Sequence, residues 1–133
     1  MREQHILETQ ITRNLEEIQK KIRVSAERSG RSLEDILLVA VSKKQPVHVV
    51  QAARAAGIRD FGENYPEQAV DKLDAFAGDS NIRWHMIGHL QSRKARLVAE
   101  RFHFFQSQDS VEIAAKINNL LSGCGRKMPV LLQ

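Results

Sequence analysis

The sequence predicts an α/β fold in which helices flank a parallel β-sheet. Residues 36–41 (ILLVAV) form a continuous apolar run, which is typical of a strand buried on both faces of a parallel sheet. Strand-like and helix-like segments then alternate about every 20–27 residues. The predicted strands begin near residues 36, 58, 83, 102 and 129. Alternation of this kind favours parallel strands that are joined by crossover helices.

A long amphipathic helix is predicted over residues 5–28. Its apolar residues recur at spacings of one, three and four, which places them on one stripe of a helix. They are Ile6, Leu7, Ile11, Leu15, Ile18, Ile22 and Ala26. Gly30 follows the pattern as a C-terminal stop signal.

The first βα unit follows directly. The strand at 36–41 leads to Pro46, which opens a helical pattern as proline does in a first turn. Gly57 ends that helix, and a short strand is predicted over 58–61.

The same cycle continues to the end of the chain. We expect helices over 65–77, 92–99 and 110–121, strands over 83–87, 102–106 and from 129, and turns at 78–81 and 123–127. Ser92 is the expected N-cap of the second of these helices, because a serine hydroxyl accepts a hydrogen bond from a free N–H of the first turn.

Two architectures fit this order, an open doubly wound sheet and a (β/α)8 barrel. A barrel needs roughly 250 residues, whereas this chain has 133 and stops inside a predicted fifth strand. We therefore expect residues 1–133 to be one domain from the N-terminal part of a longer protein. It would comprise an N-terminal helix within 1–30, then four βα units and the start of a fifth strand over 36–133.

The composition is that of an ordinary globular protein, with 42% hydrophobic and 27% charged residues. The longest apolar run is far shorter than the roughly 20 residues that cross a bilayer, so no membrane partner is expected. A single cysteine, Cys124, excludes an internal disulfide framework and favours a reducing, cytoplasmic setting. The net charge of +4 comes mainly from a basic surplus over 83–101, which is modest for a nucleic-acid surface.

Polar or glycine-bearing segments follow four of the predicted strands. They are 42–44, 62–65, 88–91 and 107–110. Ligands of α/β folds bind outside the carboxyl ends of the strands, so these segments are expected to converge at one rim.

Lys43 is the most informative residue of that rim. A partly desolvated lysine at a strand end can act as an amine nucleophile toward an aldehyde, although spacing alone favours a plain surface lysine in a βα loop. Lys44 is an equal competitor by spacing. Strand alternation would place Lys43 on the Val39 and Val41 side and Lys44 on the other side.

The other rim residues have two interpretations each. Asn64 and Tyr65 can supply hydrogen bonds to a ligand, or Asn64 can simply serve a turn. His85 lies inside the strand RWHMI and is more typical of a core histidine, whereas His89 is better placed for a ligand. No pattern of metal-ligating residues is present.

Three segments resemble the signature segments of the pyridoxal 5′-phosphate (PLP) homeostasis proteins, the YggS/PROSC type. They are LLVAVSKKQP (37–46), FGENY (61–65) and WHMIGHLQSRK (84–94). The resemblance covers essentially residues 10–133. It implies the first half of a (β/α)8 barrel like the N-terminal domain of alanine racemase, after an extra N-terminal helix.

The resemblance also implies the site. Lys43, the lysine of the V-S-K segment, would carry PLP as an aldimine, and Asn64 would lie near the cofactor ring. His85 and Ser107 would be further lining residues. The pattern departs at Gln45, where relatives carry a second lysine, at Pro66, and at Gln106, where many have a histidine.

The implied function is that of a non-catalytic PLP carrier in cytoplasmic PLP homeostasis, which passes the cofactor to PLP-dependent apo-enzymes. The phosphate site of such barrels follows late strands, so residues 1–133 alone are expected to bind PLP weakly. One alternative is a PLP-dependent enzyme of the amino-acid racemase type. The other is a cofactor-free module that binds RNA or another anion through 83–101.

Overall fold

The computed structural model describes all of residues 1–133, which divide into two units. Met1–Leu38 and Pro46–Ile58 form the first, here called the helical unit. Val39–Gln45 and Arg59–Gln133 form the second, here called the sheet unit. None of the helices combines the length and the apolar character needed to cross a membrane.

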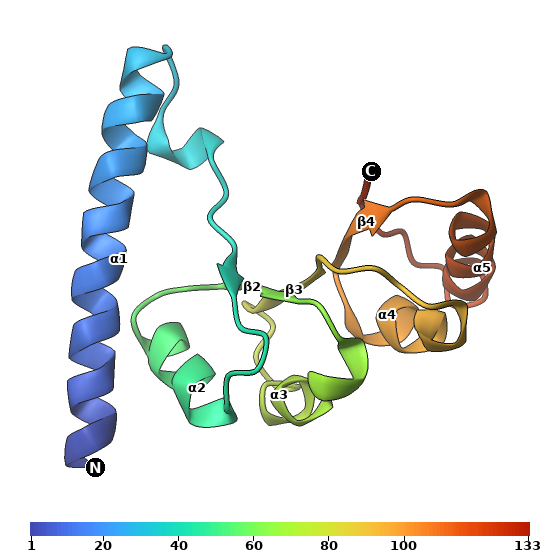
Figure 1. Cartoon of the computed structure of the whole chain (residues 1–133), viewed down its shortest axis with the longest axis horizontal. Coiled ribbons are helices and arrows are strands. Elements are labelled where there is room, and N and C mark those ends of the chain that lie inside the picture. Colours follow the sequence, from blue (N-terminus) through green and yellow to red (C-terminus); the bar gives the residue numbers. More distant parts are fainter. The chain divides into compact units, whose positions relative to one another are not determined.

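The helical unit places the long helix α1 (Arg2–Arg28) beside α2 (Val47–Ala55), with the short 3-10 helix η1 (Leu33–Asp35) after α1 (Figure 1). The predicted stripe of α1 is only partly covered: Leu15 and Ala26 are buried, whereas Ile6 and Ile18 are exposed. The nine residues of α2 span about 14 Å at 1.5 Å per residue. This length is too short to cover all 27 residues of α1.

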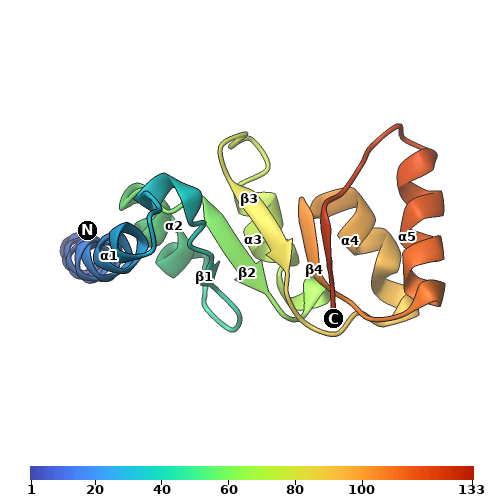
Figure 2. The same cartoon turned by 90° about the horizontal axis from the view of Figure 1, so that it is seen from above.

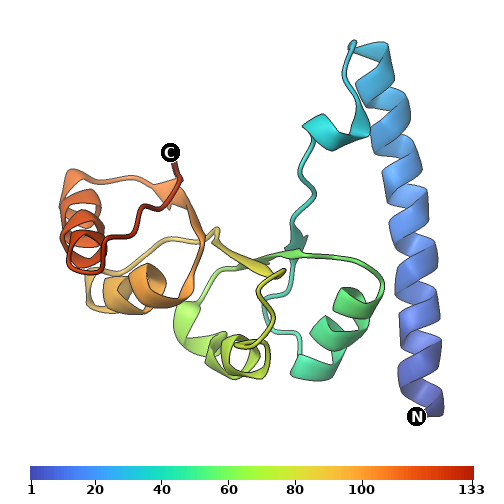
Figure 3. The same ribbon diagram turned by 180° about the vertical axis from the view of Figure 1, so that it is seen from behind.

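The sheet unit contains five parallel strands in the order β1-β2-β3-β4-β5 (Figure 2). The strands are β1 (Ala40–Val41), β2 (Asp60–Glu63), β3 (Arg83–Met86), β4 (Phe104–Gln108) and β5 (Val130–Leu132). The helices α3 (Val70–Ala75), α4 (Ala95–Arg101) and α5 (Val111–Ser122) lie on one face of this sheet (Figure 3). The predicted α/β fold with a parallel sheet is confirmed.

The two faces of the sheet differ in what they carry. Phe61 and Trp84 point to the helices, and Trp84 contacts Phe76 at the end of α3, with ring centroids 6.2 Å apart. The intervening residues of β2 and β3, Gly62 and His85, face the opposite side because strand residues alternate. The apolar core of this unit therefore lies between the sheet and its helices.

Several predicted boundaries were wrong, and hydrogen bonds explain why. The run 36–41 pairs only at Ala40 and Val41, because β2, its one neighbour, begins at Asp60, one residue before the partner of Ala40. The strands predicted at 58 and 102 begin two residues later. The N–H groups of Ile58 and Phe102 still donate to carbonyls of the preceding helices, those of Ala53 and Val98.

Two helix predictions also needed correction. Residues 65–77 form a 3-10 helix η2 (Pro66–Gln68) followed by the short α3, not one helix. Ser92 is not an N-cap: it lies inside a 3-10 helix η3 (Ser92–Lys94), and its hydroxyl accepts from Lys116 Nζ at 3.2 Å. Ser110 is the serine that caps a helix, accepting from the Ile113 N–H at 3.2 Å.

His103 makes the stability of this unit dependent on pH. Its Nδ1 accepts a hydrogen bond from the backbone N–H of Trp84 at 2.9 Å, which requires the neutral ring. Burial lowers the pKa of His103, and the nearby positive charge of Arg126 lowers it further. Below the ordinary pKa of about 6.5 the unfolded chain therefore binds more protons than the folded one. The free energy of unfolding should fall as the pH drops from about 6.5 toward the lowered value.

Urea unfolding at about pH 7.5 and about pH 5.5 tests this expectation. His103→Asn keeps an acceptor near the Trp84 N–H but cannot titrate, so its midpoint should fall less between the two pH values than that of the wild type. His5→Asn, on the exposed start of α1, is the matched control and should behave as the wild type. Equal pH dependence in all three chains would contradict the assignment to His103.

Candidate functional site

The carboxyl ends of the strands lie along one edge of the sheet, as Figure 2 shows. Val41 pairs with Gly62, and Gly62 pairs with His85. Lys43 and Asn64 follow the carboxyl ends of β1 and β2, which end at Val41 and Glu63, so both lie at this edge. The predicted convergence of the first polar segments at one rim is therefore found for the segments that hold these two residues.

Lys43 lies in a tight turn directly after β1. The N–H of Gln45 donates to the carbonyl of Ser42 at 3.1 Å, which closes a four-residue turn with Lys43 in its second position. Lys44 has φ of 60°, a left-handed conformation that is uncommon for a residue with a side chain. Strand alternation thus ends at Val41 and does not separate Lys43 from Lys44, contrary to the expectation above. Both lysines are exposed.

The buried side chains of Glu63 and Lys72, here called the clamp, hold Ser42, the residue that precedes Lys43. The hydroxyl of Ser42 donates to Glu63 Oε1 at 2.9 Å. Lys72 Nζ on α3 donates to the carbonyl of Ser42 at 2.7 Å and forms an ion pair with Glu63. All three residues are at most 4% exposed. The clamp therefore joins β1, β2 and α3 immediately behind the rim.

Sequence reasoning missed the clamp, although a signal was present. Lys72 lies at helical spacing with Ala69, Leu73 and Phe76, on the face that packs against the sheet. A lysine on such an apolar face needs a buried partner. Glu63, which lies within the segment FGENY, is that partner.

Asn64 carries the unsatisfied group of the rim. Its side-chain Oδ1 is buried and has no hydrogen-bond partner, which costs roughly 1–3 kcal/mol. The loop at Gly88 passes so close that a Cβ there would lie 2.6 Å from the carbonyl oxygen of Asn64. Only glycine permits this approach. An acceptor held in this way fits a ligand that brings a hydroxyl or N–H donor.

His85 is fully buried, one row below Asn64 on the face away from the helices. Its Nε2 contacts Asp60 Oδ1 at 2.8 Å, and its Nδ1 contacts Gln106 Nε2 at 2.9 Å. The ring stacks on Phe104 with centroids 4.3 Å apart, and Arg83 completes the chain by donating to Asp60 at 2.8 Å. Both nitrogens of His85 thus have protein partners.

Ser107 connects β4 to the same rim. It is buried, and its hydroxyl donates to the carbonyl of Gly88, the residue against which Asn64 packs. Asn64 and Ser107 are therefore brought together through Gly88. Lys43 follows the neighbouring strand end, and His85 lies on β3 beside Gly62, two residues before Asn64. No group of three or more His, Cys, Asp or Glu side chains is arranged to hold a metal ion.

The basic residues of 83–101 are mostly paired within the sheet unit. Lys94 contacts Glu67 at 2.5 Å, and this hydrogen bond lowers the pKa of Glu67. The other ion pairs join Arg83 to Asp60, Arg96 to Glu100, and Arg101 to Asp74. The surplus of positive charge in segment 83–101 is therefore largely neutralised by carboxylates of the sheet unit.

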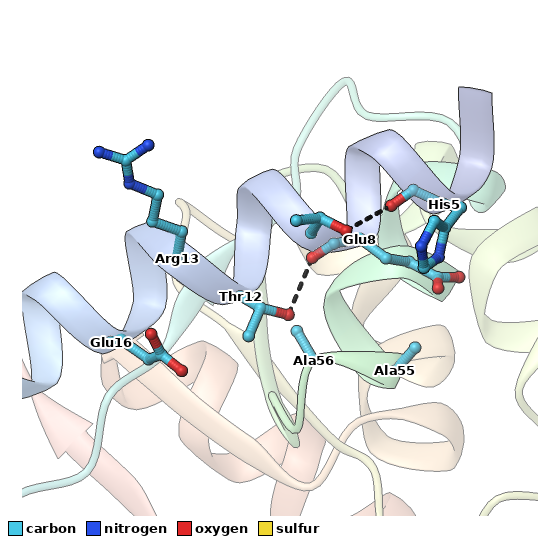
Figure 4. Close-up of a pocket in the computed structure, with 8 residues that line it drawn as sticks. His5, Glu8, Thr12, Arg13, Glu16, Ala55 and Ala56 are labelled. Atoms are coloured by element: carbon cyan, nitrogen blue, oxygen red, sulfur yellow. Dashed lines mark hydrogen bonds between the residues drawn. The ribbon is translucent and has the colours of Figure 1, made fainter. Parts of the chain in front are cut away.

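One hollow lies at the rim and another lies in the helical unit. The first, of about 430 Å³, lies between the loops after β2 and β3 and is lined by Asn64, Gly88 and mainly exposed polar residues. The other, of about 370 Å³, lies between α1 and α2 of the helical unit (Figure 4). There the hydroxyls of Thr9 and Thr12 donate to carbonyls one turn earlier, at 2.9 and 2.8 Å. They are thus already engaged by their own helix.

Comparison with known proteins identifies the relatives of this chain, although no family model matches it. It is 45% identical over 111 residues to the pyridoxal phosphate homeostasis protein of Escherichia coli, covering 82% of this chain and 47% of that protein. It is 40% identical over 126 residues to the protein of the same name from Vibrio alginolyticus, covering 92% and 54%. The chain spans about half the length of the curated relatives it matches.

Solved structures agree with these sequence relatives. PipY of Synechococcus elongatus, solved with PLP bound, is 34% identical with a TM-score of 0.70 and covers 81% of this chain and 50% of that one. An unknown protein from Bifidobacterium adolescentis is 27% identical with a TM-score of 0.84, covering 95% and 55%. The predicted resemblance to the PLP homeostasis proteins is confirmed.

The close approach of Gly88 to Asn64 can be tested by substitution. Gly88→Ala should lower the free energy of unfolding by about 1–3 kcal/mol, because the added Cβ forces the two loops apart. Gly78→Ala is the control: a Cβ there meets no atom within 4 Å, so its free energy of unfolding should change by less than about 0.5 kcal/mol. Urea unfolding measures both variants, and equal midpoints would show that the loops are free to separate.

Proposed function

We propose that this chain is the N-terminal half of a PLP homeostasis protein, a (β/α)8 barrel of the alanine racemase N-terminal-domain type, and that it holds PLP through Lys43. The observation that carries the proposal is the rim: an exposed lysine lies in the turn after β1, and the adjacent strand β2 is followed by Asn64, whose buried oxygen lacks a partner. Its support comes from relatives named PLP homeostasis proteins and from PipY with PLP bound. That residues 1–133 belong to one barrel domain is part of the same proposal.

The residues of the rim fit the cofactor. When bound, PLP supplies a reactive aldehyde on an electron-withdrawing pyridine ring. The amine of Lys43 would hold that aldehyde carbon, since a lysine amine is the side chain that condenses with carbonyl groups. Asn64 Oδ1 would accept a hydrogen bond from a donor of the cofactor. His85, beneath, and Ser107, through the Gly88 loop, would complete the lining.

We propose a carrier without catalytic turnover. A PLP-dependent catalyst also needs an acid or base that reaches the reacting atoms. Both nitrogens of His85 are engaged by Asp60 and Gln106, so this buried histidine is not free for proton transfer. The carrier would shield the aldehyde in the cytoplasm and pass PLP to the apo-forms of PLP-dependent enzymes.

The geometry favours this function over a cofactor-free RNA- or anion-binding module. Such a module needs cations free to meet phosphates. In segment 83–101 four of the basic side chains face carboxylates instead, and Arg93 donates to Gln91 at 3.2 Å. A salt-dependent affinity for RNA that Arg93→Ala weakens would favour the alternative.

Borohydride trapping tests the proposal directly. The chain is incubated with excess PLP and reduced, and the pyridoxyl group is mapped by peptide mass spectrometry. We expect the group on Lys43, its loss in Lys43→Ala and its retention in Lys44→Ala, the matched neighbour. We also expect weak binding, because the phosphate site of such barrels follows late strands.

Two results would change the proposal. Absence of a Lys43 adduct both here and on a chain extended through a whole barrel would overturn the role of the cofactor. Turnover of D- or L-alanine that disappears in Lys43→Ala would replace the carrier with a racemase-type enzyme.

A further inference from the structure

Ser42 is restrained through every polar group that it has. Its N–H donates to the carbonyl of Gly62 at 2.9 Å, and its hydroxyl donates to Glu63. Its carbonyl accepts from Lys72 Nζ and also from the N–H of Gln45, the bond that closes the turn. The first residue of the turn is thus fixed to β2 and α3, whereas the two residues that follow, Lys43 and Lys44, are exposed.

The turn itself is strained at Lys44. A φ of 60° is left-handed, and a lysine gains nothing there that would offset its Cβ clash. Such a conformation persists only where the surroundings over-determine it. The surroundings that do so here are the contacts of Ser42 with the clamp, because Lys72 binds the same carbonyl that receives the Gln45 N–H.

Burial of the two charges of the clamp costs free energy. Glu63 and Lys72 lose nearly all their hydration, and a buried ion pair is a weak source of stability compared with apolar side chains of the same size. Its geometric effect is larger: it is a rigid, directional tie between β1, β2 and α3. A tie of this kind, placed one residue before Lys43, sets where the amine of Lys43 can reach.

We propose that Glu63 and Lys72 are positioning residues, which act through Ser42 to hold the turn and so direct the amine of Lys43, not that of Lys44, toward the cofactor. This inference rests on the proposed function, since it concerns the choice between two adjacent lysines as the covalent holder of PLP. Lys43 and Lys44 are both exposed and of identical chemistry, so only the backbone conformation of the turn distinguishes them.

The test removes both charges together, because removing one would leave the other buried and unpaired. The variant is Glu63→Gln/Lys72→Met, which keeps the side-chain volumes. The matched control is Asp74→Asn/Arg101→Gln, which removes an exposed ion pair between α3 and α4. Each chain is treated with PLP and borohydride, and the pyridoxyl group is counted on Lys43 and on Lys44. Hydrogen exchange of the Gln45 amide is measured without PLP.

In the wild type and the control we expect Lys43 to carry about tenfold more adduct than Lys44. In the clamp variant this ratio should fall to about threefold or less, and the Gln45 amide should exchange at least about tenfold faster. An unfolded chain does not distinguish the two lysines, so the ratio is compared under conditions in which urea unfolding shows that each variant is folded. Adding Lys44→Gly, which accepts φ of 60° without strain, should restore protection of the Gln45 amide.

Should the clamp variant not fold, Ser42→Ala tests the same tie more gently, with Ser42→Thr restoring the hydroxyl. The adduct ratio should fall in Ser42→Ala and recover in Ser42→Thr. An unchanged ratio and unchanged Gln45 exchange would overturn the inference while a Lys43 adduct on the wild type keeps the proposed function. A wild type without adduct on Lys43 would overturn both.

Discussion

The buried ion pair between Lys72 and Glu63 is the interaction on which the rim of the sheet depends. It ties β1, β2 and α3 together at the point where the first strand ends. Breaking one partner of such a pair typically costs about 3–5 kcal/mol, because the other charge stays buried alone. The carbonyl of Ser42 that Lys72 binds also accepts the Gln45 N–H, which closes the turn that contains Lys43 and the left-handed Lys44.

The parallel register then decides which groups are satisfied and which are available. The face away from the helices carries one chain of hydrogen bonds, which runs from Arg83 through Asp60 and His85 to Gln106. One row higher, the oxygen of Asn64 lacks a partner and Lys43 is exposed. The sheet thus places hydrogen-bonded polar groups beneath one buried acceptor that has no partner. A cofactor at this edge would contact an acceptor that is free to bond and an accessible amine, above side chains that are already hydrogen-bonded.

Charge counts and charge environments lead to different conclusions for the segment 83–101. By composition it is the most basic stretch of the chain, which made an anionic partner worth considering. In the folded sheet unit its cations meet carboxylates from three other places, among them Glu67 and Asp74. Composition counts charges, but only packing decides whether they face solvent or each other, and here packing favours the rim as the functional surface.

The sequence by itself determined the α/β class with its parallel sheet and the order of the elements, and it predicted the rim. Apolar periodicity and the glycine and proline residues that end or begin elements are local signals, and they do not depend on contacts with distant residues. The motif around Lys43 likewise indicated the family and the cofactor that the relatives share. Tertiary structure alone decided the short pairing of β1, the left-handed Lys44, the clamp at Lys72 and the bonded state of His85. The bonds of His85 to Asp60 and Gln106 and those of Ser42 to Glu63 and Lys72 join residues more than 20 positions apart. Local periodicity can mark Lys72 as a buried lysine, but it does not say which residues of other elements bind it.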